Sequence, residues 1–366
     1  MQMQYSSIFN HRDFNKIYKK TEIPGVFYLN IKSPLAAQFE LTSGCNQKCI
    51  FCYNVWKDGC KKIKTSRLSK RLQLKILDKL IDNEIFDLIF SGGEPLMVSW
   101  LEDLVKKASD NKIKTSIITN ALLLDKKRAL DLKKAGLVGL QISLHHYNSR
   151  INDKLTGNKG AFNKTVSGIK NAIAVFGEDK VNVNMVALPS TYKEVYSMAK
   201  FLHSIGVSSF SVATPTATGE MGNNKKLVID KKMFLDIFEQ LRNAKKDFGI
   251  SVGFTGGFPM CILPKINPET IAMIGNYCDA GLNQLVVDPE GNLKPCVCLD
   301  EKLGNILNDD MKTIWNKNRF LINIRQLKFL PFECSKCKYL SMCRGGCRAS
   351  AKGYFGKINA RDPLMQ

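Results

Sequence analysis

Residues 36–52 read AAQFELTSGCNQKCIFC, so that a short β-rich run leads directly into three closely spaced cysteines. The run over 36–41 has the composition of a strand, and Cys45, Cys49 and Cys52 follow it without helical spacing. Three thiolates this close together on one loop can converge on a single iron–sulfur cluster. The stretch therefore predicts a metal-binding loop at the end of a strand.

The three cysteines leave a [4Fe–4S] cluster one ligand short. Such a cluster is usually held by four cysteines, and the next one, Cys60, comes only after Asp58 and Gly59. An iron with an open position can bind a substrate or cofactor, as catalytic zinc does. The alternative is a structural zinc site completed by Cys60, but Cys45 and Cys49 are separated more widely than the cysteines of zinc knuckles normally are. We therefore predict an open cluster.

Alternating elements follow this loop and indicate an α/β fold. Residues 36–220 alternate β-rich runs with amphipathic stretches, which is typical of βα units around a parallel sheet. After 36–41, strands are predicted at 86–90, 115–119, 138–144, 181–188 and 208–214, and helices at 69–83, 100–110, 161–176, 191–204 and 229–247, with one more helix before 138. Residues 216–226 are predicted to form a rim loop. From Phe254 the chain becomes rich in Gly, Pro and Cys, which suggests a second, metal-bound domain.

The bulk composition favours a cytoplasmic protein. The first twenty residues contain no apolar signal segment, and no run reaches the length of about 18 apolar residues that a membrane helix needs. The chain carries 54 Lys and Arg against 33 Asp and Glu, a formal charge of +21, which favours acidic partners. The lysines are scattered without aromatic interleaving, so a lysine-rich solvent shell is expected and nucleic acid is not an expected partner.

The cysteine count also favours metal sites over disulfides. There are 12 cysteines, in an early group that ends at Cys60 and a late group that begins at Cys261. Disulfides of a secreted protein would not be expected to leave such a gap. In a reducing compartment, dense and closely spaced cysteines point to metal binding.

The cysteine loop resembles the signature of the radical S-adenosylmethionine (SAM) superfamily, which forms a partial (β/α)6 TIM-like barrel. The resemblance implies that Cys45, Cys49 and Cys52 hold a [4Fe–4S] cluster whose open iron binds S-adenosyl-L-methionine. Reductive cleavage of this cofactor then gives a 5′-deoxyadenosyl radical, which abstracts a substrate hydrogen. Phe51 matches the aromatic residue that packs beside the adenine.

Further cofactor contacts are implied at the ends of later predicted strands, where barrels of this kind build their sites. Gly92, Gly93, Glu94 and Pro95 match the family motif that binds the methionyl amino group: glycines allow close approach, and Glu94 can offset the ammonium. Other expected cofactor-binding residues are Asn120, which follows Thr119, and Ser143. The family's usual Asp-Gly after Ser-Leu is replaced here by His145 and His146, which could face substrate or could be packed.

The late cysteines resemble a SPASM domain, which binds auxiliary iron–sulfur clusters. Its pattern is met by Cys278, Gly291 and Cys296, followed by Cys-x2-Cys-x5-Cys-x3-Cys over residues 334–347. The resemblance implies a first auxiliary cluster on Cys278, Cys296 and Cys347, with Cys261 as fourth ligand, and a second one on Cys334, Cys337 and Cys343. A zinc ribbon on the last four cysteines is the alternative.

The chain departs from the SPASM pattern at its end. Met365 stands where family members often have a final cysteine, and a thioether is a poor replacement for a thiolate. The fourth ligand of the second auxiliary cluster could be Cys298 or Asp362, or the site could be open.

These expectations divide the chain into four parts: an N-terminal extension over 1–35, the radical SAM partial barrel over 36–225, a linker helix and strand over 226–255, and a small cysteine-rich SPASM domain over 256–366. The resemblance implies an enzyme that modifies a peptide or protein, by oxidation or by forming a C–C or C–S cross-link. Its expected partners are a flavodoxin or ferredoxin-type electron donor and, if a leader peptide is recognised, a separate recognition protein or another surface. The alternatives are a tetrapyrrole or haem-pathway radical SAM enzyme and a non-catalytic iron–sulfur or zinc-binding protein. No catalytic acid or base is distinguished by the sequence.

Overall fold

A curved parallel sheet organises the molecule, as seen in a computed structural model that describes residues 31–55, 67–264, 266, 270, 273 and 278–366. The strands are β1 (Ala36–Glu40), β2 (Asp87–Ser91), β3 (Lys114–Thr119), β4 (Gly139–Ser143), β5 (Val181–Val186), β6 (Ser209–Ala213), β7 (Ser251–Thr255), β8 (Gln284–Val287), β9 (Asn292–Lys294) and β10 (Gly304–Asn305). Their order is β10-β9-β8-β1-β2-β3-β4-β5-β6-β7. Strands β1 to β7 run parallel, and β8 adds in parallel to the other edge of β1. The expected α/β partial barrel is confirmed. Cys60 and residues 1–30 of the expected extension lie outside the described residues.

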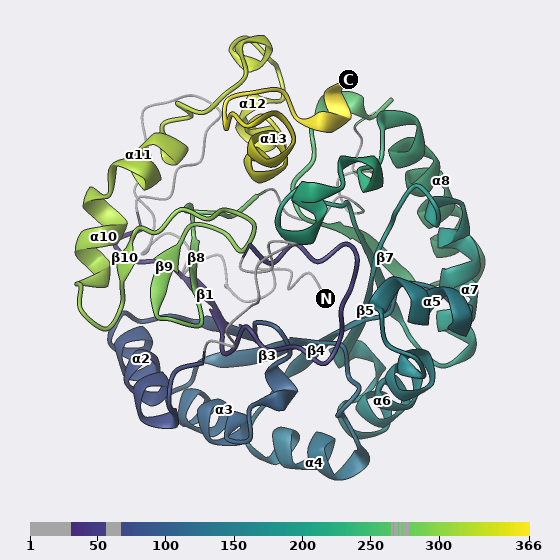
Figure 1. Cartoon of the computed structure of the whole chain (residues 1–366), viewed down its shortest axis with the longest axis horizontal. Coiled ribbons are helices and arrows are strands. Elements are labelled where there is room, and N and C mark those ends of the chain that lie inside the picture. The colour runs from purple at the N-terminus through teal and green to yellow at the C-terminus, as the bar shows by residue number, and fades with distance from the viewer. Residues whose placement is uncertain (1–30, 56–66, 265, 267–269, 271–272, 274–277) are drawn as a thin grey trace.

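Helices cover the outside of this sheet. In Figure 1, α2 (Lys70–Asp82), α3 (Leu101–Asp110), α4 (Lys126–Lys134), α6 (Ala161–Phe176), α7 (Val195–Ser204) and α8 (Lys231–Phe248) follow one another around it. Their ends follow from local chemistry. Asp230 caps α8 by accepting a hydrogen bond from the Met233 N–H at 2.8 Å, and Gly249 ends it in the left-handed conformation.

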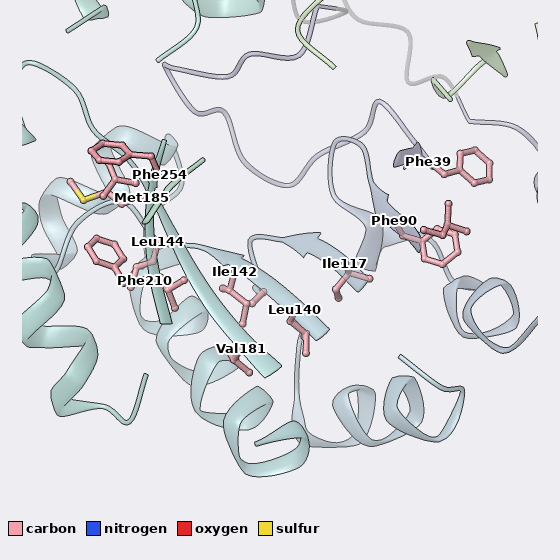
Figure 2. Packing of buried hydrophobic residues seen from close by; sticks show 14 of the residues in the cluster. Phe39, Phe90, Ile117, Leu140, Ile142, Leu144, Val181, Met185, Phe210 and Phe254 are labelled. Carbon is pink, nitrogen blue, oxygen red and sulfur yellow. The ribbon is translucent and has the colours of Figure 1, made fainter. Parts of the chain in front are cut away.

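The two faces of the strands carry different chemistry. Apolar side chains such as Phe39, Phe90 and Phe210 point outward and pack under the helices, where they are fully buried (Figure 2). Burial of each such side chain contributes about 1.5–3 kcal/mol. The alternate residues are mostly small or polar, for example Gln141 and Asn184, and they face a cavity inside the curve. A closed TIM barrel fills this space with branched apolar side chains, so the alternation itself leaves room for a ligand.

The sheet extends beyond the boundaries expected from the sequence. Residues 226–255, assigned to a linker, form α8 and β7, and β7 pairs with β6 as a seventh parallel strand. The predicted rim loop over 216–226 contains the 3₁₀ turns η5 (Gly219–Asn223) and η6 (Lys225–Leu227).

The cysteine-rich region continues the same sheet. Strand β8 pairs in register with β1, so that Ala36 lies opposite Gln284. The remaining elements of this region are α10 (Met311–Lys317), α11 (Arg319–Arg325), α12 (Leu340–Cys343) and α13 (Arg348–Phe355). Among the described helices, none is long and apolar enough to cross a membrane.

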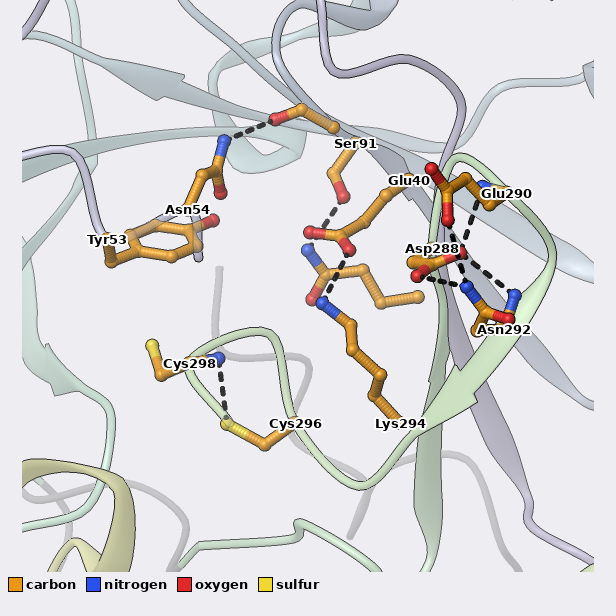
Figure 3. Close-up of polar contacts among 12 residues, drawn as sticks. Glu40, Tyr53, Asn54, Ser91, Asp288, Glu290, Asn292, Lys294, Cys296 and Cys298 are labelled. Atoms are coloured by element: carbon orange, nitrogen blue, oxygen red, sulfur yellow. Dashed lines mark hydrogen bonds and ion pairs between the residues drawn. The ribbon is translucent and has the colours of Figure 1, made fainter. Parts of the chain in front are cut away.

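A buried ion pair joins strand β1 to the cysteine-rich region. Figure 3 shows Lys294 of β9 reaching Glu40 of β1, with Nζ and Oε2 3.2 Å apart and each side chain only 1% exposed. Burial raises the pKa of Glu40 to about 8, although the charge of Lys294 acts in the opposite direction. Removing one member of such a pair leaves the other polar group buried without compensation.

We expect Lys294→Met to lower the free energy of unfolding by about 3–5 kcal/mol, the usual cost of breaking a buried pair. Chemical denaturation of the anaerobically reconstituted protein at pH 8 measures it. Adding Glu40→Leu to Lys294→Met should restore most of the lost free energy of unfolding. Lys106→Met, which removes an exposed pair with Asp110, should leave the denaturation midpoint unchanged. An equal effect of Lys294→Met and Lys106→Met would contradict the role of the buried pair.

Candidate functional site

The candidate site is a cavity of about 490 Å³ inside the curve of the sheet. This volume lies in the range of small-molecule sites. The cavity is lined by residues from β1 to β7 and by cysteines from both cysteine-rich regions: Cys45, Cys49, Cys52, Cys278, Cys296, Cys298 and Cys347. The structure thus brings seven thiols from three separate stretches of sequence to one cavity.

The loop with Cys45, Cys49 and Cys52 is held by backbone contacts on both sides. On one side the Gly93 N–H donates to the Thr42 carbonyl at 2.6 Å and the Glu94 N–H to the Gly44 carbonyl at 2.9 Å. On the other side, the N–H groups of Lys48 and Ile50 donate to the carbonyls of Thr156 and Leu155, at the end of α5 (Ser149–Thr156). Backbone hydrogen bonds to two neighbouring segments therefore position this loop.

The two glycines of the Gly-Gly-Glu-Pro motif leave space for the backbone of this loop. A Cβ on Gly93 would lie 2.0 Å from the Gly44 carbonyl oxygen, and one on Gly92 would lie 2.5 Å from that of Thr42. Gly92 also has φ +130°, which L side chains rarely adopt. Both glycines line the cavity, but the close approach that requires them is to the cysteine loop.

Glu94 is the central polar group of this region. Its Oε1 accepts hydrogen bonds from the Thr119 hydroxyl at 2.6 Å and the Leu96 N–H at 3.0 Å, and its Oε2 accepts one from the Asn120 N–H at 2.8 Å. Burial raises the pKa of Glu94 to about 7, and these hydrogen bonds oppose the rise. A carboxyl group with a pKa near 7 ionises readily when a cation binds, and it can then pair with the positive charge of a ligand.

The remaining sequence-predicted cofactor residues are brought together only in part. Phe51, Asn120 and Ser143 line the cavity with Glu94. The Asn120 side chain donates to the Asn46 side chain at 2.7 Å, inside the cysteine loop. Pro95 does not line the cavity: it is buried as the first residue of η2 (Pro95–Met97), where its fixed φ suits the start of a helical turn.

His145 is a packed residue of the cavity wall. Its ring lies edge-on to Phe51 with centroids 4.5 Å apart, and its Nδ1 accepts the Val186 N–H at 3.2 Å. Burial lowers the pKa of His145 to about 3, so the ring is neutral. His146 is buried as well, stacks on Tyr147 and does not line the cavity.

The first auxiliary set consists of Cys278, Cys296, Cys298 and Cys347. Burial, together with the neighbouring thiols of Cys347 and Cys296, raises the pKa of Cys278 to about 12. The Cys298 N–H donates to Cys296 Sγ at 3.2 Å (Figure 3). Cys298 therefore accompanies the first set, where the sequence had offered it as a ligand of the second.

The second set contains Cys334, Cys337 and Cys343, with Cys261 beside them. Cys261 is exposed, and partial desolvation together with the thiols of Cys343 and Cys337 raises its pKa. Burial also raises the pKa of Cys334 to about 11, and Cys343, Cys337 and Cys261 add to this shift. Cys261 thus lies beside the second set, whereas the sequence had offered it as the fourth ligand of the first.

The spacing of these side chains bears on the kind of metal they suit. Within the described ranges, no three His, Cys, Asp or Glu side chains are close enough to hold one metal ion. The thiolates around a [4Fe–4S] cluster bind separate irons and so lie farther apart than ligands of a single zinc. Three thiols on one loop at a shared cavity fit a cluster with one open iron.

Sequence reasoning missed Tyr53, which lies between the two groups of cavity cysteines. Burial raises its pKa well above the ordinary value, and Cys298, Glu40, Cys52 and Cys296 raise it further. Its position directly after Cys52 is the signal that could have identified it. Asp279, which follows Cys278 and lines the cavity, was missed in the same way.

We expect Gly93→Ala to prevent iron binding by the first cysteine loop, because the new methyl group needs the space of the Gly44 carbonyl. Iron and acid-labile sulfide after anaerobic reconstitution should fall by about the content of one [4Fe–4S] cluster. Gly222→Ala is the matched control, since its nearest neighbour would be the Ala217 carbonyl oxygen at 3.6 Å. Full iron content in Gly93→Ala would show that the loop does not depend on this contact.

Comparisons with known proteins agree with this arrangement. Residues 39–202 match the model of the radical SAM superfamily, and residues 278–348 match that of the SPASM iron–sulfur cluster-binding domain. The chain is 22% identical to the AdoMet-dependent heme synthase of Methanosarcina barkeri, over 90% of this chain and 96% of that protein. It is 26% identical to a mycofactocin maturase of Mycolicibacterium smegmatis, over 92% and 84%.

The fold is also found in solved structures. Crystal structures of SuiB from Streptococcus suis, bound to S-adenosylmethionine or to the precursor peptide SuiA, match with TM-scores of 0.73 and 0.71 at 20% identity. The matches cover 92% and 91% of this chain, and 78% and 75% of SuiB. The cysteine loop, the glycine motif and the late cysteines from Cys278 onward lie in the two regions matched by the family models, and Cys261 lies between those regions. The chain therefore carries a radical SAM domain over residues 39–202 and a SPASM iron–sulfur cluster-binding domain over residues 278–348.

Proposed function

We propose that this protein is a radical SAM enzyme that modifies a peptide or protein. The observation that carries the proposal is one cavity shared by the three loop cysteines and the four cysteines of the first auxiliary set. When bound, the loop cluster and S-adenosyl-L-methionine supply a 5′-deoxyadenosyl radical that removes a substrate hydrogen. An auxiliary cluster beside the same cavity could take the one electron that the substrate radical releases as it is oxidised to product.

The chain's own residues would hold the cluster and the cofactor and orient them. Cys45, Cys49 and Cys52 would bind three irons of the loop cluster. Glu94 would face the methionyl ammonium, with its two oxygens already aligned by Thr119 and Asn120. Phe51 would pack against the adenine, and its own position is fixed by His145, whose neutral ring is held by the Val186 N–H.

The cavity wall favours a peptide over an acidic small molecule. Among the described residues that line it, none is Lys or Arg, and the carboxyl groups are those of Asp87, Glu94 and Asp279. Side-chain amides line it as well, at Gln38, Gln47, Asn54, Asn120, Gln141, Asn184 and Gln284. Amides both donate and accept hydrogen bonds, so they suit the N–H and C=O groups of a peptide backbone.

A tetrapyrrole is the second candidate substrate, because a heme synthase is among the relatives. Tetrapyrrole intermediates carry several carboxylates, which proteins usually recognise with Arg or Lys. The described cavity wall offers no such cation. We therefore rank the peptide first.

The chain's charge suits acidic partners. With a net charge of +21, it can attract an acidic electron donor of the flavodoxin or ferredoxin type, or an acidic leader peptide presented by a separate recognition protein. These partners are part of the proposal.

Joint substitution of Cys45, Cys49 and Cys52 by Ala should abolish formation of 5′-deoxyadenosine, since no open iron remains to bind the cofactor. Iron content should fall by about a third, because the auxiliary clusters remain. Chromatography of the reduced, reconstituted enzyme with S-adenosyl-L-methionine measures the product. Cys60→Ala is the control and should match the parent. Continued turnover in the triple variant would refute the assignment.

The substrate class is tested with the same assay. Peptides with acidic leaders should increase 5′-deoxyadenosine formation and gain a mass change that requires the cofactor. Carboxylated porphyrins and their precursors should do neither. Stimulation by a tetrapyrrole alone would replace the peptide proposal with the haem-pathway one.

The pKa of Glu94 predicts a proton release on cofactor binding. A carboxyl with a pKa of about 7 is about half protonated at pH 7, and a bound cation favours its ionised form. Calorimetry in buffers of different ionisation enthalpy should show that the parent releases up to about half a proton more than Glu94→Gln at pH 7. The difference should approach about one proton at pH 6 and vanish by about pH 8.5.

Glu102→Gln is the control, because it alters a carboxyl paired with Arg128 on the surface. It should behave as the parent does. No difference between the parent and Glu94→Gln from pH 6 to 7 would mean that Glu94 does not sense the cofactor's charge.

A further inference from the structure

The second auxiliary site has a ligand problem that the sequence leaves open. Cys334, Cys337 and Cys343 supply three thiols, and Met365 occupies the position at which SPASM domains often have a final cysteine. A [4Fe–4S] cluster that serves only as an electron carrier is ordinarily held by four thiolates. The fourth donor must come from elsewhere in the chain if the site is closed.

Two of the sequence-based candidates are engaged at other places. Asp362 is 2% exposed; its Oδ2 accepts the Cys347 N–H at 2.7 Å and its Oδ1 accepts the Leu364 N–H at 3.0 Å. Cys298 lines the main cavity beside Cys296, and its N–H donates to Cys296 Sγ. Both residues are thus already bonded to members of the first set, Asp362 to the Cys347 N–H and Cys298 to Cys296.

Cys261 is placed there by the short 3₁₀ turn η7 (Met260–Ile262). The N–H of Met260, the residue before it, donates to Cys343 Sγ at 3.3 Å. The thiols that act electrostatically on Cys261 are those of Cys343 and Cys337. The turn that carries Cys261 is thus tied directly to a ligand of the second set.

The same turn also lies against the end of the chain. η7 contacts η9 (Pro363–Met365), the turn that contains Met365. Cys261 therefore belongs to the neighbourhood in which a C-terminal cysteine at position 365 would lie. A thiol brought from upstream can occupy that neighbourhood without a cysteine at the chain's end.

We propose that Cys261 completes the second auxiliary cluster site, together with Cys334, Cys337 and Cys343. Cys298 then joins Cys278, Cys296 and Cys347, so that each auxiliary site has four thiols. The proposal rests on the cluster-binding part of the proposed function and is independent of the substrate. It makes the loop cluster of Cys45, Cys49 and Cys52 the one with an open iron.

The test uses the full chain with Cys45, Cys49 and Cys52 changed to Ala, so that only auxiliary clusters are observed. Adding Cys261→Ala leaves one auxiliary iron without a thiolate. Mild oxidation should then remove about one iron per chain and give the electron paramagnetic resonance signal of a [3Fe–4S] cluster, or remove the whole second cluster. The parent triple variant should retain its iron and show no such signal. Retention of all iron by Cys261→Ala, without the signal, would overturn the proposal.

Pairwise combinations identify the cluster that is affected. Cys261→Ala should add nothing to the iron loss of Cys334→Ala, because both act on one cluster, and should add to that of Cys278→Ala. The reverse pattern would place Cys261 in the first set and overturn the proposal. Met365→Cys, added to Cys261→Ala, should restore iron retention because η9 lies against η7; this rescue separates loss of a ligand from misfolding.

Failure of this inference is distinguishable from failure of the proposed function. Cys261→Ala in the otherwise unaltered chain should still show the reduced loop cluster and bind S-adenosyl-L-methionine by calorimetry. If neither iron nor sulfide is bound by any variant, the cluster-binding assignment itself is wrong.

Discussion

Two backbone hydrogen bonds, from Gly93 to Thr42 and from Glu94 to Gly44, fix the geometry on which the site depends. They join the loop after β1 to the turn after β2 so closely that neither glycine can carry a side chain. Glu94 extends the connection to β3 through Thr119 and Asn120. The cluster loop and the cofactor motif are consequently one hydrogen-bonded unit, and these bonds help to set the positions of its thiols.

The polar inner face of the sheet depends on the incompleteness of the barrel. A closed barrel of this size would exclude water and leave Gln141, Asn184 and their neighbours without space or partners. The curve instead opens onto the SPASM region, whose strand β8 pairs with β1 and whose Lys294 reaches Glu40. The outer face supplies the hydrophobic stabilisation, so the inner face can carry the polar residues that line the site.

The electrostatic environment of the buried cysteines favours the binding of a metal cluster. Burial and neighbouring thiols raise the pKa of Cys278 to about 12 and those of Cys334 and Cys347 to about 11. Several buried thiolates would repel one another, and a cluster supplies the positive charge that stabilises them. Loading of the auxiliary clusters and folding of the cysteine-rich region should therefore be linked. Arg348 lies near Cys334, Cys343 and Cys347 and donates to the carbonyls of Ile358 and Ala360, which ties the segment after α13 to these cysteines.

The sequence alone predicted strands β1 to β6, most of the helices that cover them and the loop cysteines, because these follow from short-range periodicity and spacing. It also indicated the cofactor motif and the SPASM cysteines through their resemblance to a family. Only the tertiary structure placed the late cysteines relative to one another: one thiol is chemically like another, so the sequence could not show that Cys261 lies near Cys343 while Cys298 lies near Cys347. The fold likewise decided that Gly92 and Gly93 accommodate the cysteine loop and that the cavity wall carries no Lys or Arg among the described residues. These facts depend on contacts between segments far apart in the chain, which local patterns do not record.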